Sequence, residues 1–283
     1  MIVLPTLQYL LARLAGRDPD ASADWAPEHA DESDLADELE GIPGGPASAL
    51  ECLADRVCAD VTEIDLRSEA ASVTYRSGSY RGKLKRTLFP LRDLRKLRVV
   101  LMVHQTGFEA PSRSSVWRKV TAHDVVRPDA ALCRLHDPAV RLVAGNRIDR
   151  APWGGVHLEV GGNLERIDGD GSWWSPETAG RGRASDGQIA AARRWVVRTV
   201  GELGAFGIVV EGIAPHVVTG RDSRGRPNRG ACPGSRLHAE VVEWAGAEIE
   251  LAVPGPGFAL GGSPVDPAWH GEHWSRCRRF LAA

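Results

Sequence analysis

A continuous apolar segment that runs directly into polar residues is the feature of this sequence that most restricts its fold. Residues 97–104 read Leu97-Arg-Val-Val-Leu-Met-Val-His104, and the polar turn Gln105-Thr-Gly107 follows. A run of this kind is typical of a strand buried inside a sheet. The segment is therefore expected to form a central strand that has His104 at its end.

Three further strands and two helices are expected after this strand. The strands are predicted at residues 122–126, 156–160 and 207–210, and a closing helix at about 235–244. The clearest helix starts at a Ser185 or Asp186 cap and runs to about Leu203. Its inward-facing residues are Ile189, Ala192, Trp195, Val196 and Val200. This alternation predicts an α/β fold with a mixed central β-sheet flanked by helices and an N-terminal appendage.

The 283 residues allow one large domain with a sizeable appendage. Residues 1–80 are expected to hold an N-terminal helix after Pro5, an acidic linker and a small accessory segment with short strands at 61–66 and 71–75. A short helix is predicted at about 47–60. Residues 81–250 are expected to form the main domain, and residues 251–283 a tail that packs on it.

The charge of the chain is divided unevenly between its front and its body. Residues 1–60 carry 13 acidic and 3 basic side chains, which leaves −10, and the remainder carries 32 basic and 24 acidic side chains, which leaves +8. The body is therefore a candidate for polyanionic partners. Residues 81–119 hold 11 bases and 2 acids, but they match no nucleic-acid-binding motif, so no nucleic-acid partner is expected.

Three residues far apart in the chain carry side chains that zinc prefers. His104 ends the first strand, His216 follows the fourth in Ala214-Pro-His-Val-Val-Thr, and Cys232 opens Cys-Pro-Gly-Ser before the last helix. Three such ligands leave one tetrahedral position open to water. On spacing alone, satisfied core histidines and a buried cysteine are the commoner explanation of such residues.

Four sequence blocks, in order, resemble the zinc-dependent N-acetylmuramoyl-L-alanine amidases, a family that includes phage lysozyme-type amidases and peptidoglycan recognition proteins. The first is Val100-Leu-Met-Val-His104-Gln-Thr-Gly107, and the second is Ala122-His-Asp-Val-Val126. The third is Val156-His-Leu-Glu-Val-Gly-Gly-Asn163, and the fourth is Cys232-Pro-Gly-Ser-Arg-Leu. The resemblance covers about residues 97–245 and implies an amidase-like catalytic domain within 81–250.

The resemblance also implies the roles of individual residues. His104, His216 and Cys232 would be the Zn²⁺ ligands, and Glu159 the catalytic carboxylate. The implied reaction is hydrolysis of the N-acetylmuramoyl-L-alanine amide bond, with peptidoglycan or a muropeptide as partner. For Glu159, a salt bridge to an arginine is the structural alternative.

Further residues are expected to line the site. Arg229, His123 or both would stabilise the oxyanion, although His123 could equally fill the core. His157 shares a strand face with Glu159 and could line the site, and Trp173 with Trp174 could stack on sugar rings or anchor a loop.

The sequence departs from the family pattern in two places. His216 precedes Cys232 by 16 residues, a longer interval than is usual, and an alternative alignment puts Gly220 at the ligand position and leaves only two ligands. The basic residue that usually lies two before the last ligand is replaced by Gly230, with Arg229 beside it. These departures keep open a non-catalytic peptidoglycan-binding module of the same fold.

The five cysteines and the N-terminus bear on where the protein acts. An odd number of irregularly spaced cysteines favours a reduced compartment, although Cys52 and Cys58 could pair. The first 15 residues lack a basic region typical of export signals and are too short to cross a membrane. We expect synthesis in the cytoplasm without a signal peptide and no membrane span. The site of action is open, with the cell wall, reached after lysis or by dedicated secretion, as a candidate; oligomeric state is equally open.

Overall fold

The computed structural model describes residues 60–74, 82–106, 110–142, 144–162, 164, 183–220 and 232–280. Its strands are β1 (Glu63–Asp65), β2 (Arg98–Gln105), β3 (Asp124–Val126), β4 (Leu132–Arg134), β5 (Trp153–Val160), β6 (Val210–Pro215), β7 (Ala252–Val253) and β8 (Arg278–Arg279). The α-helices are α4 (Arg67–Ala71), α5 (Lys85–Leu88), α6 (Asp186–Gly204), α7 (Ser235–Leu237) and α8 (Trp244–Glu248). The 3-10 helices are η2 (Leu94–Lys96), η3 (Ser115–Lys119), η4 (Asn146–Asp149), η5 (His216–Val218), η7 (Pro267–Trp269) and η8 (Trp274–Arg276). The π-helical segment η6 (His238–Glu243) joins α7 to α8.

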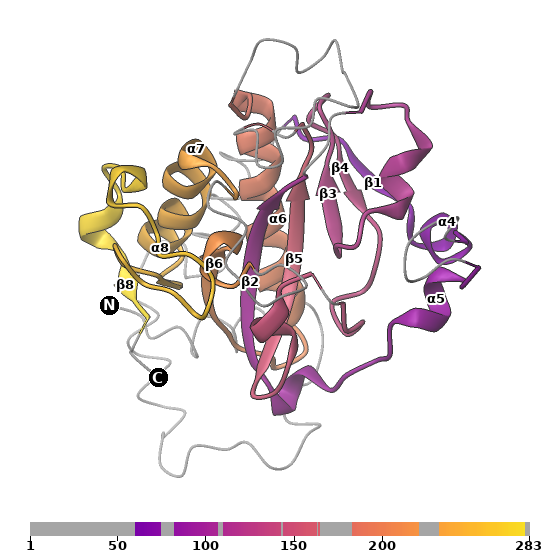
Figure 1. Cartoon of the computed structure of the whole chain (residues 1–283), viewed down its shortest axis with the longest axis horizontal. Helices are drawn as coiled ribbons and strands as arrows, with labels where there is room; N and C mark the ends of the chain where they lie inside the picture. The colour runs from indigo at the N-terminus through magenta and orange to yellow at the C-terminus, as the bar shows by residue number, and fades with distance from the viewer. Residues whose placement is uncertain are drawn as a thin grey trace, which may run out of the picture.

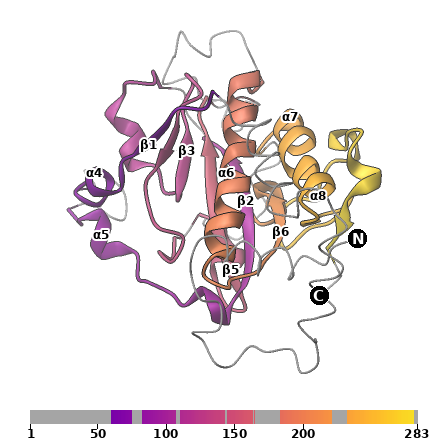
Figure 2. The same ribbon diagram turned by 180° about the vertical axis from the view of Figure 1, so that it is seen from behind.

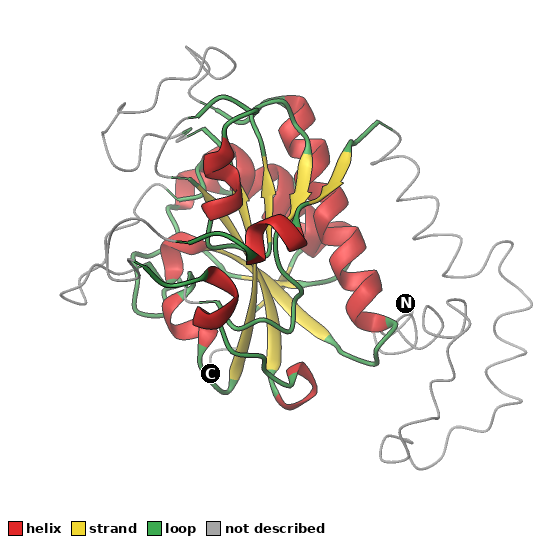
Figure 3. Cartoon of the chain, turned by 90° about the vertical axis from the view of Figure 1, so that its right-hand side faces the viewer, coloured by secondary structure: helices red, strands yellow, loops and turns green. Residues whose placement is uncertain are grey.

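The strands form one mixed sheet in the order β1-β4-β3-β5-β2-β6-β7-β8 (Figure 1). Strands β3, β5, β2, β6, β7 and β8 run parallel, and β4 pairs antiparallel with β3, so that β4 and β1 run the other way. The strands fan out with the twist of an open sheet (Figure 3). The predicted mixed central sheet with helices is confirmed, and the carboxyl ends of β2, β5 and β6 meet at one edge.

One face of the sheet carries the main hydrophobic core. Leu101 and Val103 of β2 and Leu158 of β5 are fully buried there with apolar residues of α6, which crosses this face (Figure 2). The five residues predicted to face inward from α6 are all buried. Ser185, one of the two residues predicted to cap this helix, is its N-cap, and it forms a capping box with Gln188. The helix from α7 through η6 to α8 adds to the same core.

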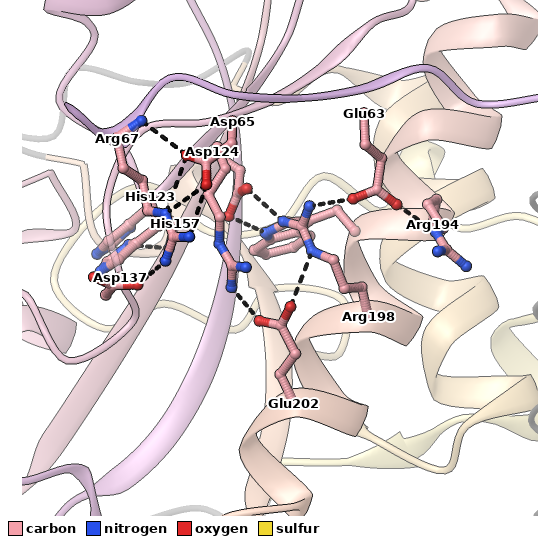
Figure 4. A network of polar contacts seen from close by, with 12 residues as sticks. Glu63, Asp65, Arg67, His123, Asp124, Asp137, His157, Arg194, Arg198 and Glu202 are labelled. Carbon is pink, nitrogen blue, oxygen red and sulfur yellow. Dashed lines mark hydrogen bonds and ion pairs between the residues drawn. The ribbon is translucent and has the colours of Figure 1, made fainter. Parts of the chain in front are cut away.

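An ion-pair network fixes α6 to the far strands of the sheet (Figure 4). Arg198 of α6 pairs with Asp124 of β3 and, at 2.7 Å, with Glu63 of β1. Trp195 Nε1 donates a hydrogen bond to Asp124 Oδ2 at 3.0 Å. Burial lowers the pKa of Arg198, and the two carboxylates together raise it by more than burial lowers it. The pKa of Arg198 therefore lies above its ordinary value. The buried charge on this face is therefore paired and hydrogen-bonded.

The other face is covered by shorter elements. Val100 and Met102 of β2 pack against Ile148 of η4, Val217 of η5 and Val265 in the C-terminal segment, residues 251–280. The opposite sides of the same strand thus contact a long helix on one face and irregular segments on the other. Within the described ranges, no helix is long and apolar enough to cross a membrane.

Some predicted elements are displaced or absent. The fourth strand begins at Val210, where the prediction for 207–210 ends. The predicted strand at 71–75 is wrong, because Ala71 ends α4 and Thr74 forms only an isolated bridge with Leu84. Strand β4 was not predicted, and the tail contributes β8 to the sheet. The N-terminal helix, the acidic linker, the helix at 47–60 and the Cys52–Cys58 pair lie outside the described residues.

Candidate metal centre

The three predicted metal ligands come together at the carboxyl edge of the sheet. His104 is the second-last residue of β2, and His216 directly follows β6, the strand beside β2. Cys232 reaches them because Val217 N–H donates to the Cys232 carbonyl oxygen at 2.8 Å. One donor atom from each of the three lies within 4.8 Å of the others, and all three side chains are buried.

The spacing of these donor atoms suits a metal ion. Cys232 Sγ and His216 Nδ1 are 3.6 Å apart. Sulfur and nitrogen ligands of one tetrahedral zinc, at about 2.3 Å and 2.1 Å from the ion, lie roughly 3.5–3.6 Å from each other. The rings of His104 and His216 approach to 4.1 Å between centroids. The types of the three donors and the separation of Sγ and Nδ1 therefore fit zinc.

A buried hydrogen-bond chain orients His104. Asp149 Oδ1 accepts from His157 Nε2 at 2.6 Å, and His157 Nδ1 lies 2.9 Å from His104 Nε2. Because the carboxylate accepts, we assign the His157 proton to Nε2 and the His104 proton to Nε2. His104 Nδ1 then carries the lone pair. This tautomer is the one that can bind a metal through Nδ1.

His157 is held in place by its surroundings. Its backbone N–H donates to His123 Nδ1 at 2.9 Å, and the two rings stack at 5.5 Å. A Cβ on Gly145 would lie 2.5 Å from His157 Cε1, and one on Gly155 would lie 2.9 Å from His157 Nε2. These two glycines leave the room that the ring occupies, and Gly145 N–H also donates to Asp149 Oδ2 at 2.6 Å.

His123 is fully buried, and both of its ring nitrogens are engaged. Nδ1 accepts from His157 N–H, and Nε2 lies 2.9 Å from the Val140 carbonyl oxygen. Burial, with a smaller contribution from His157, lowers its pKa well below the usual value. His123 is therefore a neutral residue that supports His157, and it makes no direct contact with the three ligands among the bonds described.

Glu159 lies beside the ligand cluster. It is the register partner of His104 across the β2–β5 pair, so the two side chains point to the same face. Glu159 Oε1 lies 4.0 Å from His104 Nδ1, and the side chain is 18% exposed. Glu159 is therefore a partly exposed side chain at the edge of a buried cluster.

The Cys232-Pro233-Gly234 turn delivers Cys232 to the cluster. Gly234 has φ 98°, a conformation that favours glycine, and α7 follows it directly. Cys232 Sγ accepts from Gln105 N–H at 3.4 Å, which ties the turn to the end of β2.

The remaining predicted site residues have different outcomes. Arg229, Asn163, Trp173 and Trp174 lie outside the described residues. His216, and not the position of Gly220, is placed beside the other two ligands. Asp149 was not predicted, because a single aspartate at the end of a short 3-10 helix carries no sequence pattern before the fold brings it to His157.

Comparisons with known proteins find similarity only among solved structures. No protein-family model matches the sequence, and no curated protein matches it. Among solved structures, Drosophila PGRP-LB shares 14% identity with a TM-score of 0.39, covering 65% of this chain and 95% of its own. Drosophila peptidoglycan recognition protein SD shares 12% with a TM-score of 0.38, covering 62% and 89%. The N-acetylmuramoyl-L-alanine amidase LysC from Clostridium intestinale shares 9% with a TM-score of 0.35, covering 62% and 90%. At this identity and TM-score the comparisons assign no family.

Proposed function

We propose that this chain hydrolyses the N-acetylmuramoyl-L-alanine amide bond of peptidoglycan with zinc as its cofactor. The observation that carries the proposal is the convergence of His104, His216 and Cys232 beside Glu159. These residues are far apart in the sequence, and they occupy the positions that resemble the ligands and the carboxylate of the zinc amidases. A chance cluster has no reason to reproduce that set.

The protein groups divide the work of an amide hydrolysis. A zinc ion held by the three ligands would act as a Lewis acid toward the amide carbonyl and lower the pKa of a water molecule. Glu159 accepts a proton from the attacking water and passes it to the departing amine. The amide C–N bond breaks, hydroxyl adds to the carbonyl carbon, and the proton goes to the nitrogen of L-alanine.

Other residues support this chemistry. Asp149 and His157 keep His104 in one tautomer and one orientation, and His123 positions His157. Arg229 stays the proposed side chain for oxyanion stabilisation. His123 is given a positioning role in place of the oxyanion contact, because both of its nitrogens are already bonded.

Mass spectrometry of purified muropeptides after incubation with the zinc-loaded full chain tests the proposal. The expected products are the free stem peptide with an L-alanine amine and the glycan with an intact lactyl carboxylate. Cys232→Ala should produce neither. Cys133→Ala is the matched control, because Cys133 is also buried but lies in β4, away from the cluster.

Sedimentation with insoluble peptidoglycan, measured beside the cleavage assay, separates the enzyme from a binding module. If the zinc-loaded chain sediments with peptidoglycan but releases no stem peptide, the catalytic proposal fails and the non-catalytic alternative is supported. If it neither binds nor cleaves, both are wrong.

A further inference from the structure

A second cluster of metal-binding side chains lies where the C-terminal segment meets the last helix. His238 and Glu243 begin and end η6, and His270 follows η7. One donor atom from each of the three lies within 4.8 Å of the others. None of these residues belongs to the candidate metal centre described above.

The π-helical form of η6 is what brings His238 and Glu243 together. In an α-helix each residue advances about 100° around the axis, so positions five apart point roughly 140° away from each other. The i to i+5 bonding of a π-helix widens the turn and places such positions on nearly the same side. His238 Nε2 consequently lies 3.7 Å from Glu243 Oε1.

The burial of the His238 side chain is the observation that the fold alone does not explain. Its side chain is fully buried, and neither ring nitrogen has a hydrogen-bond partner within the described residues. Native proteins rarely leave a buried polar group in this state, and an unplaced ion is one of the known reasons. Glu243 Oε1, the ion-pair partner of His238 Nε2, lies beyond hydrogen-bond distance.

Glu243 and His270 complete the donor set around His238. The Glu243 side chain is fully buried, and its Oε1 lies 2.5 Å from His270 Nδ1. Its Oε2 accepts from Gly271 N–H at 2.8 Å, which fixes the carboxylate without using Oε1. Trp269 packs near His238 at 5.8 Å and Trp274 near His270 at 4.3 Å, both measured between ring centroids.

We propose that His238, Glu243 and His270 form a second zinc site that fastens the C-terminal segment to the helix 235–248. Two imidazoles and one carboxylate are a ligand set that zinc accepts. An ion there would give a partner to the buried His238 nitrogen and compensate the buried carboxylate charge. The ion takes the place of the proton between His270 and Glu243. Its role is structural, and it does not depend on the proposed amidase activity.

Zinc titration of the full chain in a Cys232→Ser background tests this proposal, since that substitution disables the first cluster. After chelation and dialysis, the parent chain is expected to bind two equivalents of Zn²⁺ and the Cys232→Ser chain one. Zinc should also raise the melting temperature of the Cys232→Ser chain, because the metal binds only the folded state. A Cys232→Ser chain that is folded by circular dichroism but binds no zinc overturns the proposal.

Two further variants in the same background assign the remaining equivalent. Glu243→Gln keeps the shape and the acceptor for Gly271 N–H, and His270→Gln alters only the C-terminal segment; each should abolish the remaining zinc binding. His273→Gln is the matched control, because this histidine of the same segment lies outside the cluster. Zinc that persists in Glu243→Gln and His270→Gln would belong elsewhere and would contradict the second site.

Discussion

The two faces of the central sheet bury polar groups in different ways. On the α6 face, aliphatic residues of β2 and β5 form the core, and the buried charge of Asp124 is paired with Arg198. On the opposite face, the buried polar groups are imidazoles joined in a hydrogen-bond chain that ends at Asp149. The first arrangement holds elements together, whereas the second orients a nitrogen toward a candidate metal. Substitutions on the two faces should therefore separate stability from activity.

The largest effect is expected for Cys232→Ser, on the face of the sheet that carries the candidate metal centre. A serine hydroxyl does not replace a thiolate ligand at neutral pH, so the chain should lose one equivalent of zinc and all measurable hydrolysis. The fold should persist, because the α6 core is untouched. Elemental analysis and muropeptide cleavage measure the two losses, and an unchanged zinc content would remove Cys232 from the site.

Glu159→Gln should separate chemistry from metal binding on the same face. We expect zinc content and peptidoglycan affinity to be retained while turnover falls by about two to four orders of magnitude, the range for a lost general base. Glu211→Gln, which changes a partly exposed carboxylate of β6 that pairs with Arg98, is the control and should leave zinc content and turnover unchanged. An unfolded Glu159→Gln chain would instead indicate a structural carboxylate.

Arg198→Met should have the opposite signature, because it breaks the α6 face. Removal of one partner of a buried ion pair leaves the other charge uncompensated and costs about 3–5 kcal/mol of unfolding free energy. Zinc content and turnover of the folded fraction should stay unchanged. Arg194→Met is the matched control one turn earlier, since its side chain is 34% exposed and its pair with Glu63 should contribute less than about 1 kcal/mol. Urea denaturation of both variants decides whether the difference exists.

Elements that depend on local sequence patterns were predicted more accurately than an element whose boundary depends on a distant partner. Strand β2 follows from a continuous apolar run, and helix α6 from an N-cap residue and apolar residues at helical spacing, and both were predicted close to their observed bounds. Strand β6 was displaced because Gly207-Ile-Val-Val210 is locally strand-like, yet pairing with β2 begins only at Val210. The pairing partner, which lies more than one hundred residues away, sets that boundary.

The candidate site shows the same limit. His104, His216, Cys232 and Glu159 could be named from a resemblance, because they lie in recognisable blocks. Asp149 acquires its role only through contact with His157. The sequence analysis did not predict that His238 and Glu243 lie close together. Residues five apart point in different directions on an α-helix, and they come together only on the π-helical turn that the structure contains.

Asp149→Asn should show a smaller effect, which tests whether the histidine chain has a function. The amide can present N–H to His157 Nε2, which would reverse the donor direction along the chain and leave His104 Nδ1 protonated. Outer partners of metal ligands contribute about 10–100-fold to metal affinity or activity. Zinc competition titrations should show a loss in that range. Asp137→Asn, at an exposed aspartate, should not.

The smallest expected effect is on the pH dependence of stability. It involves His136, a buried histidine beside the hydrogen-bonded histidines. His136 N–H donates to the His123 carbonyl oxygen at 3.0 Å, and burial, with a further contribution from Lys85, lowers the pKa of His136 to about 3. In the unfolded chain the same group has its ordinary pKa of about 6.5. Between these values the unfolded chain binds a proton that the folded chain does not, so stability must fall as the pH falls below about 6.5.

His136→Leu removes that proton linkage and keeps an apolar contact for Phe89, whose ring lies 6.0 Å from the imidazole. The loss of unfolding free energy between pH 7 and pH 5 should be smaller in the variant by about 2 kcal/mol, which corresponds to one group titrating over roughly 1.5 pH units. Urea denaturation at the two pH values measures the difference. His273→Leu, which changes a histidine of the C-terminal segment, should leave the difference as it is in the parent chain. Equal losses in the parent chain and in His136→Leu would show that the acid sensitivity of this face arises from other groups, with fully buried His123 as the first to test.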